Sequence, residues 1–408
     1  MEFEMITRLT VENFGPIRKC ELEFGDLTVV VGPQASGKSL LLQLYHFLED
    51  AEAVYQLYRR NNCDWRDVSD AVLATKLFHE LYFGEGLSSL MLSSESQKIR
   101  TDGRVQDLQQ LILKKSEQKN TSAFYIPAQR TLAFQNGWPR QFSSYAFGTP
   151  FSLRFFSETL WNLVDSFAAE ASHSLFPVEK RLKQEFRRNI DQSIYWGASV
   201  QIHKDANTGA KSIQLAQKDS RGIGYNAWSS GQREFTPLLL GCYHLMPPRQ
   251  KRKCERIHTV IIEEPEMGLH PQAIVSFFQL VLELLWRNYR IILSTHSDVI
   301  LNLVWALVNL QKLHHKNPDC GYTAFTDIFS LPRKKPILAV FNSIIRKSFR
   351  TYSFSHLKDG VTLQDISTLD PASADQTISG WGGLTGITDK VVSIIGQNYA
   401  EEGYEDGV

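Results

Sequence analysis

A glycine-rich segment near the start of the chain has the residue types and spacing of a phosphate-binding loop. It follows the pattern G-x-x-x-x-G-K-[ST] in full and consists of Gly32, Pro33, Gln34, Ala35, Ser36, Gly37, Lys38 and Ser39. Glycines let backbone N–H groups turn inward around phosphates, and a following helix presents its positive N-terminus to them. Lys38 would place its ammonium on the β- and γ-phosphates, and Ser39 would offer its hydroxyl to Mg²⁺. We therefore expect this loop to bind ATP with Mg²⁺.

Two adjacent acidic residues, Glu263 and Glu264, follow a second hydrophobic run at 257–262. One carboxylate at such a position can hold Mg²⁺ through water, and the next can orient or deprotonate an attacking water molecule. Paired acids after a strand are more often a solvated strand end. The residues that follow decide between the two interpretations, because 264–271 reads E-P-E-M-G-L-H-P.

That segment, directly after a hydrophobic strand, resembles the Walker B motif and D-loop of ABC-type ATPases in the SMC, RecF and OLD-nuclease group. The resemblance implies that Glu263 is the metal carboxylate and that Glu264 is the catalytic base. Glu263 stands where aspartate is the commoner residue in the family. Its carboxylate reaches one methylene further, which would allow slower hydrolysis.

Two further segments resemble motifs of the same family. The hexapeptide W-S-S-G-Q-R at 228–233 is similar to the L-S-G-G-Q signature, in that Ser229, Gly231 and Gln232 match while positions 228 and 230 depart. The segment I-I-L-S-T-H-S at 291–297 resembles the H-loop, which implies that His296 is the switch histidine on the γ-phosphate. An ordinary loop and a histidine at the edge of the core are the alternative interpretations of these segments.

The remaining matches lie nearer the N-terminus. The segment F-Y-I-P-A-Q-R at 124–130 resembles the strand and Q-loop region, where Gln129 would bridge Mg²⁺ and the signature loop. The stretch 9–17 is similar to the first strand pair of the family, which covers the adenine. After residue 301 the resemblance is confined to 352–366, which is similar to the late strands of relatives.

The elements that must position these residues follow from hydrophobic periodicity and turn residues. We expect an antiparallel strand pair at 6–24, strands at 27–31, 123–126, 257–262 and 289–293, helices at 39–49 and 160–186, and a hairpin of 199–202 with 212–215. A strand, a glycine loop and a helix in that order begin an α/β nucleotide-binding fold. The predicted fold is therefore α/β of the P-loop NTPase type, an ABC-type ATPase head with a helical insertion and a signature-bearing lobe.

Four regions are expected along the chain. Residues 1–50 would form the N-terminal ATPase lobe with the P-loop, and 51–120 a helical insertion too short for an SMC arm. Residues 121–250 would hold the Q-loop region and the signature-bearing lobe. Residues 251–408 would form the C-terminal ATPase lobe with Walker B, the D-loop, the H-loop and the late strands. The roles of the insertion and of residues 301–408 stay open.

Composition excludes several classes of protein. The 44 basic and 44 acidic residues balance, so overall charge gives no argument for nucleic-acid binding. Five scattered cysteines without a C-x-x-C pair predict neither a zinc site nor a disulfide framework, and a reducing cytoplasm is expected. The first residues carry acids where a signal peptide would carry a basic cluster, and we find no apolar run of membrane-spanning length. We expect a cytoplasmic protein that does not contact a membrane.

Two clusters keep alternative interpretations. The basic run at 249–256 is most simply a solvated loop, and otherwise a contact for DNA or for an acidic protein trigger. The aromatic cluster is most simply core packing, and otherwise a docking face; its members are Tyr145, Phe147, Phe151, Phe155 and Phe156.

The family resemblance also implies how the protein works. Two heads would sandwich two ATPs, with the P-loop of one and Ser229 of the other on the same γ-phosphate, so the protein would be a homo-oligomer, at least a dimer. A stand-alone head of this length resembles ATPase subunits of bacterial anti-phage defence operons, such as the PARIS and Septu ATPases, which hold a separate nuclease or toxin. The alternatives are a RecF-like DNA-repair ATPase that binds DNA directly and a non-hydrolysing scaffold. Neither the trigger nor the effector can be identified from the residues.

Overall fold

The computed structural model describes residues 5–60, 98–106, 121–142, 149–169, 173–217, 222–248, 253–254, 256–385, 391–392 and 394–395. Most of the predicted insertion at 51–120 and most of the basic run at 249–256 lie outside these ranges. So do Tyr145 and Phe147 of the aromatic cluster. In the described ranges, no helix combines the length and hydrophobicity needed to cross a membrane.

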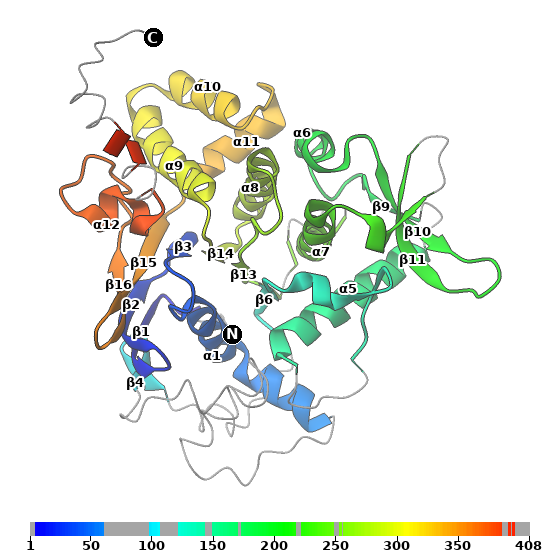
Figure 1. The fold of residues 1–408 in the computed structure, drawn as a ribbon. Coiled ribbons are helices and arrows are strands. Elements are labelled where there is room, and N and C mark those ends of the chain that lie inside the picture. The colour runs from blue at the N-terminus through cyan, green and yellow to red at the C-terminus, as the bar shows by residue number, and fades with distance from the viewer. Residues whose placement is uncertain are drawn as a thin grey trace.

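The main sheet contains ten of the described strands, in the order β5-β4-β1-β2-β16-β15-β3-β14-β13-β6 (Figure 1). Their bounds are β1 Arg8–Phe14, β2 Ile17–Glu23, β3 Leu27–Val31, β4 Lys98–Thr101, β5 Arg104–Gln106, β6 Ala123–Ile126, β13 Thr259–Glu263, β14 Arg290–Ser294, β15 Phe349–Leu357 and β16 Gly360–Asp365. Strands β15, β3, β14, β13 and β6 run parallel, whereas β1 pairs with β2 and β4 in antiparallel fashion. The predicted strands and the α/β fold class are confirmed.

The central strands are apolar because helices cover both faces of the sheet. Every residue of β3, β6 and β13 is buried, as expected for parallel strands inside an α/β protein. Alternate side chains enter different cores: Val30 packs with α1 (Lys38–Arg60) on one face. Val29 and Val31 pack on the other face with α8 (Pro271–Trp286), as Figure 1 shows for these two helices.

The predicted helix at 39–49 is confirmed as the first part of α1, whose backbone leaves helical geometry at Asp50. The helix predicted at 160–186 is confirmed for 160–168 and 184–186 but is wrong as one continuous helix. The chain instead forms α5 (Phe151–Ala168), β9 (Ser174–Phe176) and α6 (Gln184–Ile190). Pro177 explains the difference, because proline in a helix interior removes a hydrogen bond and clashes with the preceding turn.

A second sheet lies beside α5 and has the order β12-β11-β10-β9. The predicted hairpin is confirmed within it as β10 (Ser199–Lys204) and β11 (Lys211–Ala216), which are antiparallel. Between α6 and this hairpin, Asp191–Tyr195 form a π-helical turn, η2. Phe151 and Phe156 of the aromatic cluster are buried in the two cores, which confirms core packing for these two members.

The other described elements complete the covering layers (Figure 1). They are η1 Arg130–Ala133, β7 Phe134–Gln135, β8 Trp138–Pro139, β12 Ile223–Gly224, η3 Tyr225–Ala227, α7 Ser230–Leu245, α9 Asp298–Lys316, α10 Pro318–Ile328, α11 Lys335–Ile344, α12 Gln376–Ser379 and η4 Trp381–Gly383.

Candidate nucleotide-binding site

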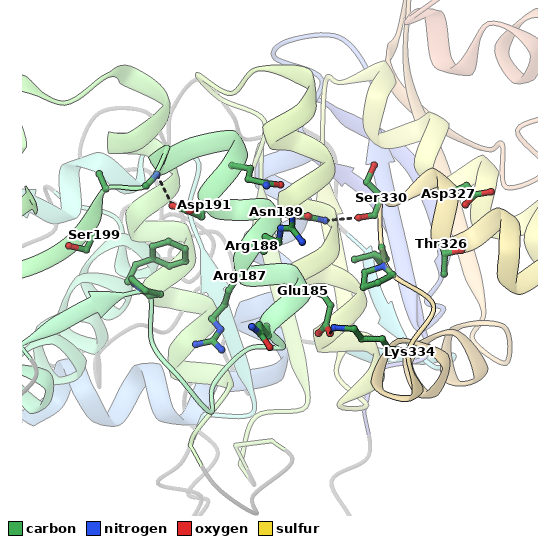
Figure 2. Close-up of a pocket in the computed structure, with 18 residues that line it drawn as sticks. Glu185, Arg187, Arg188, Asn189, Asp191, Ser199, Thr326, Asp327, Ser330 and Lys334 are labelled. Carbon is green, nitrogen blue, oxygen red and sulfur yellow. Dashed lines mark hydrogen bonds and ion pairs between the residues drawn. The ribbon is translucent and has the colours of Figure 1, made fainter. Parts of the chain in front are cut away.

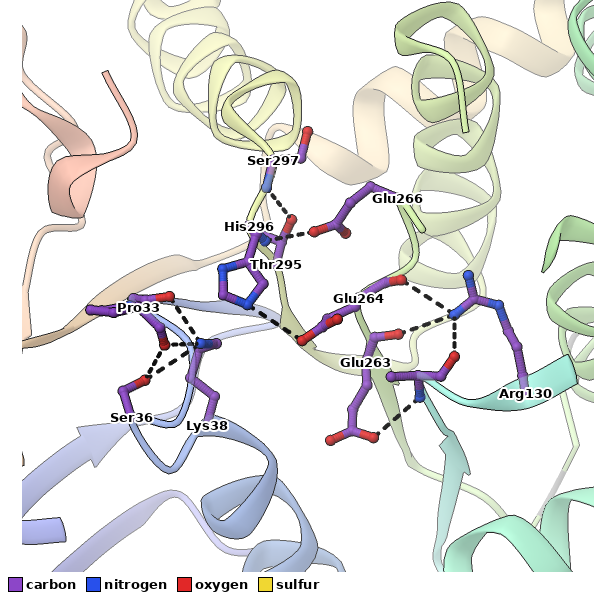
Figure 3. A network of polar contacts seen from close by, with 12 residues as sticks. Pro33, Ser36, Lys38, Arg130, Glu263, Glu264, Glu266, Thr295, His296 and Ser297 are labelled. Atoms are coloured by element: carbon purple, nitrogen blue, oxygen red, sulfur yellow. Dashed lines mark hydrogen bonds and ion pairs between the residues drawn. The ribbon is translucent and has the colours of Figure 1, made fainter. Parts of the chain in front are cut away.

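Three loops meet at the carboxyl ends of adjacent parallel strands (Figure 3). The 32–39 loop follows β3, and residues 295–297 follow β14. The segment 264–271, called the acidic segment below, follows β13. Because β3, β14 and β13 are neighbours and run in one direction, their carboxyl ends share one edge of the sheet. In open α/β sheets this edge is the usual place for ligands.

The backbone of the 32–39 loop needs glycine at two positions. Gly32 has φ +144°, and a Cβ there would lie 2.8 Å from the Cβ and the carbonyl oxygen of Phe354. Gly37 has φ +88°, and a Cβ there would lie 3.1 Å from Ile17. Both conformations strain a residue with a side chain. The helix α1 begins directly after the loop, at Lys38, so the amides of its first turn face the loop.

Lys38 directs its charge into the loop. Its side chain is 5% exposed, and Nζ donates to the carbonyl oxygens of Gly32 at 2.9 Å and Pro33 at 2.6 Å. Burial lowers the pKa of Lys38, while the charges of Glu264 and Glu266 raise it. The ammonium therefore lies between the loop and the acids of the β13 edge, and it is held only by neutral acceptors.

Glu263 has the environment of a metal ligand. It is 4% exposed, and its Oε2 accepts a hydrogen bond from the Ala128 amide at 3.2 Å. Burial raises the pKa of this carboxyl, and the hydroxyls of Ser39 and Tyr125 oppose that shift. Its Oε1 atom is buried and has no hydrogen-bond partner among the described residues.

An unpaired, buried carboxylate oxygen beside a serine hydroxyl suits Mg²⁺. This cation prefers oxygen ligands and keeps several water or phosphate oxygens of its own, so one or two protein ligands suffice. No group of three or more acidic, histidine or cysteine side chains gathers as a metal site in the described ranges. The pair Ser39 and Glu263 therefore fits a magnesium ion bound together with nucleotide phosphates.

Glu264 and His296 face each other across this edge. Oε1 of Glu264 lies 3.4 Å from Nε2 of His296, and the two side chains are 29% and 30% exposed. Glu264 has φ +41°, a left-handed conformation that is uncommon for a residue with a side chain and frequent at functional sites. Its amide donates to the Ser294 carbonyl oxygen at 2.9 Å, which fixes the turn.

Glu266 is hydrogen-bonded to the backbone of the segment that carries His296. Its Oε1 accepts a hydrogen bond from the backbone N–H of His296 at 2.6 Å. Burial raises the pKa of the Glu266 carboxyl, and the His296 amide opposes that shift. The acidic segment and the H-loop segment are thus joined directly.

The signature segment lies at the start of α7 and not beside the 32–39 loop. Ser229 is exposed and caps α7: its Oγ accepts from the Gln232 amide at 3.3 Å, and Gln232 Oε1 accepts from the Ser229 amide at 3.2 Å. Gln232 Nε2 donates to the Ile194 carbonyl oxygen at 3.1 Å. Gly231 packs on the acidic segment, since a Cβ there would lie 3.0 Å from the Gly268 carbonyl oxygen. In the described ranges, no hydrogen bond joins Ser229 to the 32–39 loop.

A family model described as "AAA domain, putative AbiEii toxin, Type IV TA system" matches residues 27–302, which is more than half of the chain. The chain belongs to this family. The match includes the 32–39 loop, the acidic segment and His296, so these residues lie within the AAA domain.

Comparison with individual proteins gives shorter or more distant matches. An OLD nuclease from Thermus scotoductus is 50% identical over 50 residues, which are 12% of this chain and 10% of that protein. A solved SMC head bound to the C-winged helix domain of ScpA is 11% identical, with a TM-score of 0.41 over 88% of this chain and 97% of that chain. The SMC head domain from Thermotoga maritima is 10% identical, with a TM-score of 0.35 over 88% and 98%.

Arg130 is a residue of the AAA domain that the sequence analysis did not single out. It is 0% exposed, and its guanidinium donates to the carbonyl oxygens of Glu263 at 3.3 Å and Glu264 at 3.2 Å (Figure 3). It also donates to the Pro265 carbonyl oxygen at 3.4 Å. Its Nε donates to the Glu234 carbonyl oxygen at 3.0 Å, and Nη2 lies 3.4 Å from Glu234 Oε2. The single side chain of Arg130 therefore connects the acidic segment to the first turns of α7.

Gln129, the neighbour of Arg130, is the predicted Q-loop residue. Its side chain is exposed and makes no hydrogen bond within the described part of the AAA domain, whereas the preceding amide, of Ala128, reaches Glu263. A role for Gln129 toward Mg²⁺ or the signature stays a prediction.

Proposed function

We propose that this protein is an ATP-dependent molecular switch that binds ATP with Mg²⁺ on the 32–39 loop and hydrolyses it. The observation that carries the proposal is the convergence of Lys38, Glu263, Glu264 and His296 on one edge of the sheet. Positioning and charge neutralisation account for most of the catalysis of phosphoryl transfer, and this edge offers both.

Each side chain has a distinct task in the proposed reaction. Lys38 exchanges its neutral carbonyl acceptors for phosphate oxygens, which gain more from a cation than a carbonyl does. Mg²⁺, held by Ser39 and Glu263, supplies further positive charge beside the phosphates. Glu264 orients a water molecule and takes its proton, and His296 holds the carboxylate from the other side.

The proposal includes a pair of heads with two ATPs between them. Ser229 is exposed at the start of a 16-residue helix, α7, and makes no hydrogen bond to the 32–39 loop of its own chain. As the capping acceptor of that helix, its hydroxyl keeps its hydrogen free to donate. A γ-phosphate bound to a second copy of the chain is a suitable acceptor for that hydrogen and for the helix terminus.

Mixing two inactive variants tests the pair. Ser229→Arg blocks the signature and Lys38→Ala removes the phosphate cation, so each variant alone should lack turnover. In a mixed pair one composite site is intact, and random pairing should restore about a quarter of the parental ATPase rate. The measurement is phosphate release from an equimolar mixture.

The matched control is Ser166→Arg, which places the same bulk on an exposed serine of α5. This control should keep parental turnover alone. If the mixture stays inactive while both variants melt like the parent, the signature does not act on a second copy.

We also infer that the switch controls a separate nuclease or toxin in anti-phage defence. The description of the family names a toxin system, which supports this role over a RecF-like one. The neighbouring gene product should co-elute with the chain in ATP and separate from it in Lys38→Ala.

Three results would contradict the inferred role. Cleavage of DNA by the isolated chain, abolished by a change within it, would place the effector activity in this polypeptide. Turnover stimulated by DNA alone would favour the RecF-like alternative, and ATP-dependent assembly without turnover would favour the scaffold.

A further inference from the structure

A cavity of about 960 Å³ lies away from the nucleotide edge (Figure 2). One wall consists of α6, the π-helical turn and the ends of β9 and β10, and the other is the end of α10 with its connection to α11. Pockets of this volume commonly hold small organic molecules. None of the residues predicted for ATP or Mg²⁺ lines this cavity.

Two of the three acidic side chains in the lining have a cationic partner, and the third accepts a backbone hydrogen bond. Glu185 Oε1 lies 3.3 Å from Lys334 Nζ, and Asp191 Oδ1 accepts from the Gly197 amide at 3.0 Å (Figure 2). Asp327 pairs at 3.9 Å with an arginine outside the lining. The charges of Glu185, Asp327 and the one lining lysine, Lys334, are therefore offset by partners, whereas Asp191 keeps its negative charge.

Two lining arginines, in contrast, have no acidic partner among the described residues. Arg187 and Arg188 project from α6 (Figure 2), and neither makes an ion pair with any described residue. The Nε atom of Arg187 is buried without a hydrogen-bond partner. A buried donor without an acceptor is destabilising, and a guanidinium prefers paired oxygen acceptors. Two arginines without an acidic partner, against one such carboxylate, leave the cavity with an excess of positive charge.

The rest of the lining is partly apolar, because Phe176, Pro177, Leu331 and Pro332 contribute to it. An inorganic ion would leave this surface uncovered, whereas an organic molecule would use it. We propose that the cavity is a binding site for a small organic ligand with a phosphate or carboxylate group, whose oxygens Arg187 and Arg188 hold.

The cavity is connected to the signature segment. Its wall includes Asp191, the first residue of the π-helical turn, and within that turn the Ile194 carbonyl oxygen accepts from Gln232 Nε2 at 3.1 Å. The Tyr195 hydroxyl lies 3.0 Å from the Thr236 hydroxyl on α7. A ligand here should therefore change ATP turnover, an effect that rests on the proposed function, whereas binding itself does not.

Binding is tested on the full chain carrying Lys38→Ala, so that phosphate probes are not held by the 32–39 loop. The probes are glycerol 3-phosphate and glucose 6-phosphate for phosphate, and citrate and glutarate for carboxylate, each titrated by calorimetry. At least one class should bind saturably. Arg187→Gln and Arg188→Gln should each weaken that binding about tenfold, the loss expected for one charge-assisted contact.

The matched control is Arg350→Gln, which removes an arginine that lies outside the lining and is paired with Glu23, also outside it. It should bind the probe like the parent. Arg188 is exposed, so its variant tests the site even if Arg187→Gln lowers the melting temperature. Binding by one probe class only assigns the phosphate or the carboxylate. No saturable binding by either class, or equal binding by all three arginine variants, overturns the site.

The effect of the bound ligand on the signature segment is measured separately, as a change in ATP turnover. With the parental 32–39 loop and saturating ATP, the bound probe should change turnover in the parent and not in Arg188→Gln. A probe that binds without changing turnover disproves the link and leaves the site. A chain that binds the probe but never hydrolyses ATP disproves the proposed function instead.

Discussion

Replacing Glu264 with glutamine is expected to slow ATP hydrolysis by about 10²–10⁴-fold, the usual effect of losing a general base. The amide keeps the shape of the side chain beside His296 but cannot take a proton from water. ATP should therefore stay bound, and paired chains should accumulate. Single-turnover hydrolysis and the mass of the ATP-bound protein in solution measure the two effects.

The neighbouring glutamate provides the control. Glu263→Gln removes a charge from the oxygen set beside Ser39, so it should raise the Mg²⁺ concentration needed for turnover. Glu264→Gln should leave the Mg²⁺ requirement unchanged. Hydrolysis at the parental rate in Glu264→Gln would mean that another group is the base.

Arg130→Lys is expected to reduce turnover by about tenfold or more while the chain stays folded. Lysine keeps the positive charge but cannot reach several acceptors at once, as the rigid guanidinium fork does. The carbonyl oxygens of Glu263 and Glu264 would lose donors, and the carboxylates would be less well positioned. Turnover number, KM for ATP and the Mg²⁺ dependence should be measured together.

Arg181→Lys is the matched control for Arg130→Lys. Arg181 is also buried and donates to two backbone carbonyl oxygens, those of Tyr243 and Met246, away from the nucleotide edge. It should lower the melting temperature without lowering the turnover number. If both variants show the same stability loss and the same unchanged turnover, Arg130 only supports the fold.

The sequence predicted the elements whose signal is local. The apolar run at 27–31 and the glycine loop after it specify a strand and a phosphate loop without reference to the rest of the chain. Trp228, which departs from the signature pattern, still fills an apolar position: it is buried, and its Nε1 donates to the Ile223 carbonyl oxygen at 2.9 Å. At position 228, the need for a buried apolar side chain explains the residue better than agreement with the signature motif does.

The contacts made by the side chains depend on long-range packing and could not be predicted. Arg130 and Gln129 are adjacent polar residues, and only the fold determines that the first is buried and the second exposed. Gln232 matched the signature by type, yet its side chain is occupied by hydrogen bonds within the chain. The helix predicted at 160–186 continued an apolar spacing past Pro177, although the fold uses Leu175 and Phe176 in a strand.

The contacts of Arg130 have a consequence for how the two nucleotide sites of a pair affect each other. One end of its guanidinium holds α7 through Glu234, and the other holds the backbone of the two carboxylates. In the proposed pair, α7 of each chain would bind the nucleotide of its partner, while the carboxylates act on the chain's own nucleotide. Loading of one half would then adjust how fast the other half hydrolyses its nucleotide, without being required for it. The pair would respond cooperatively to ATP, so that turnover rises more steeply with ATP concentration than two unconnected sites would allow.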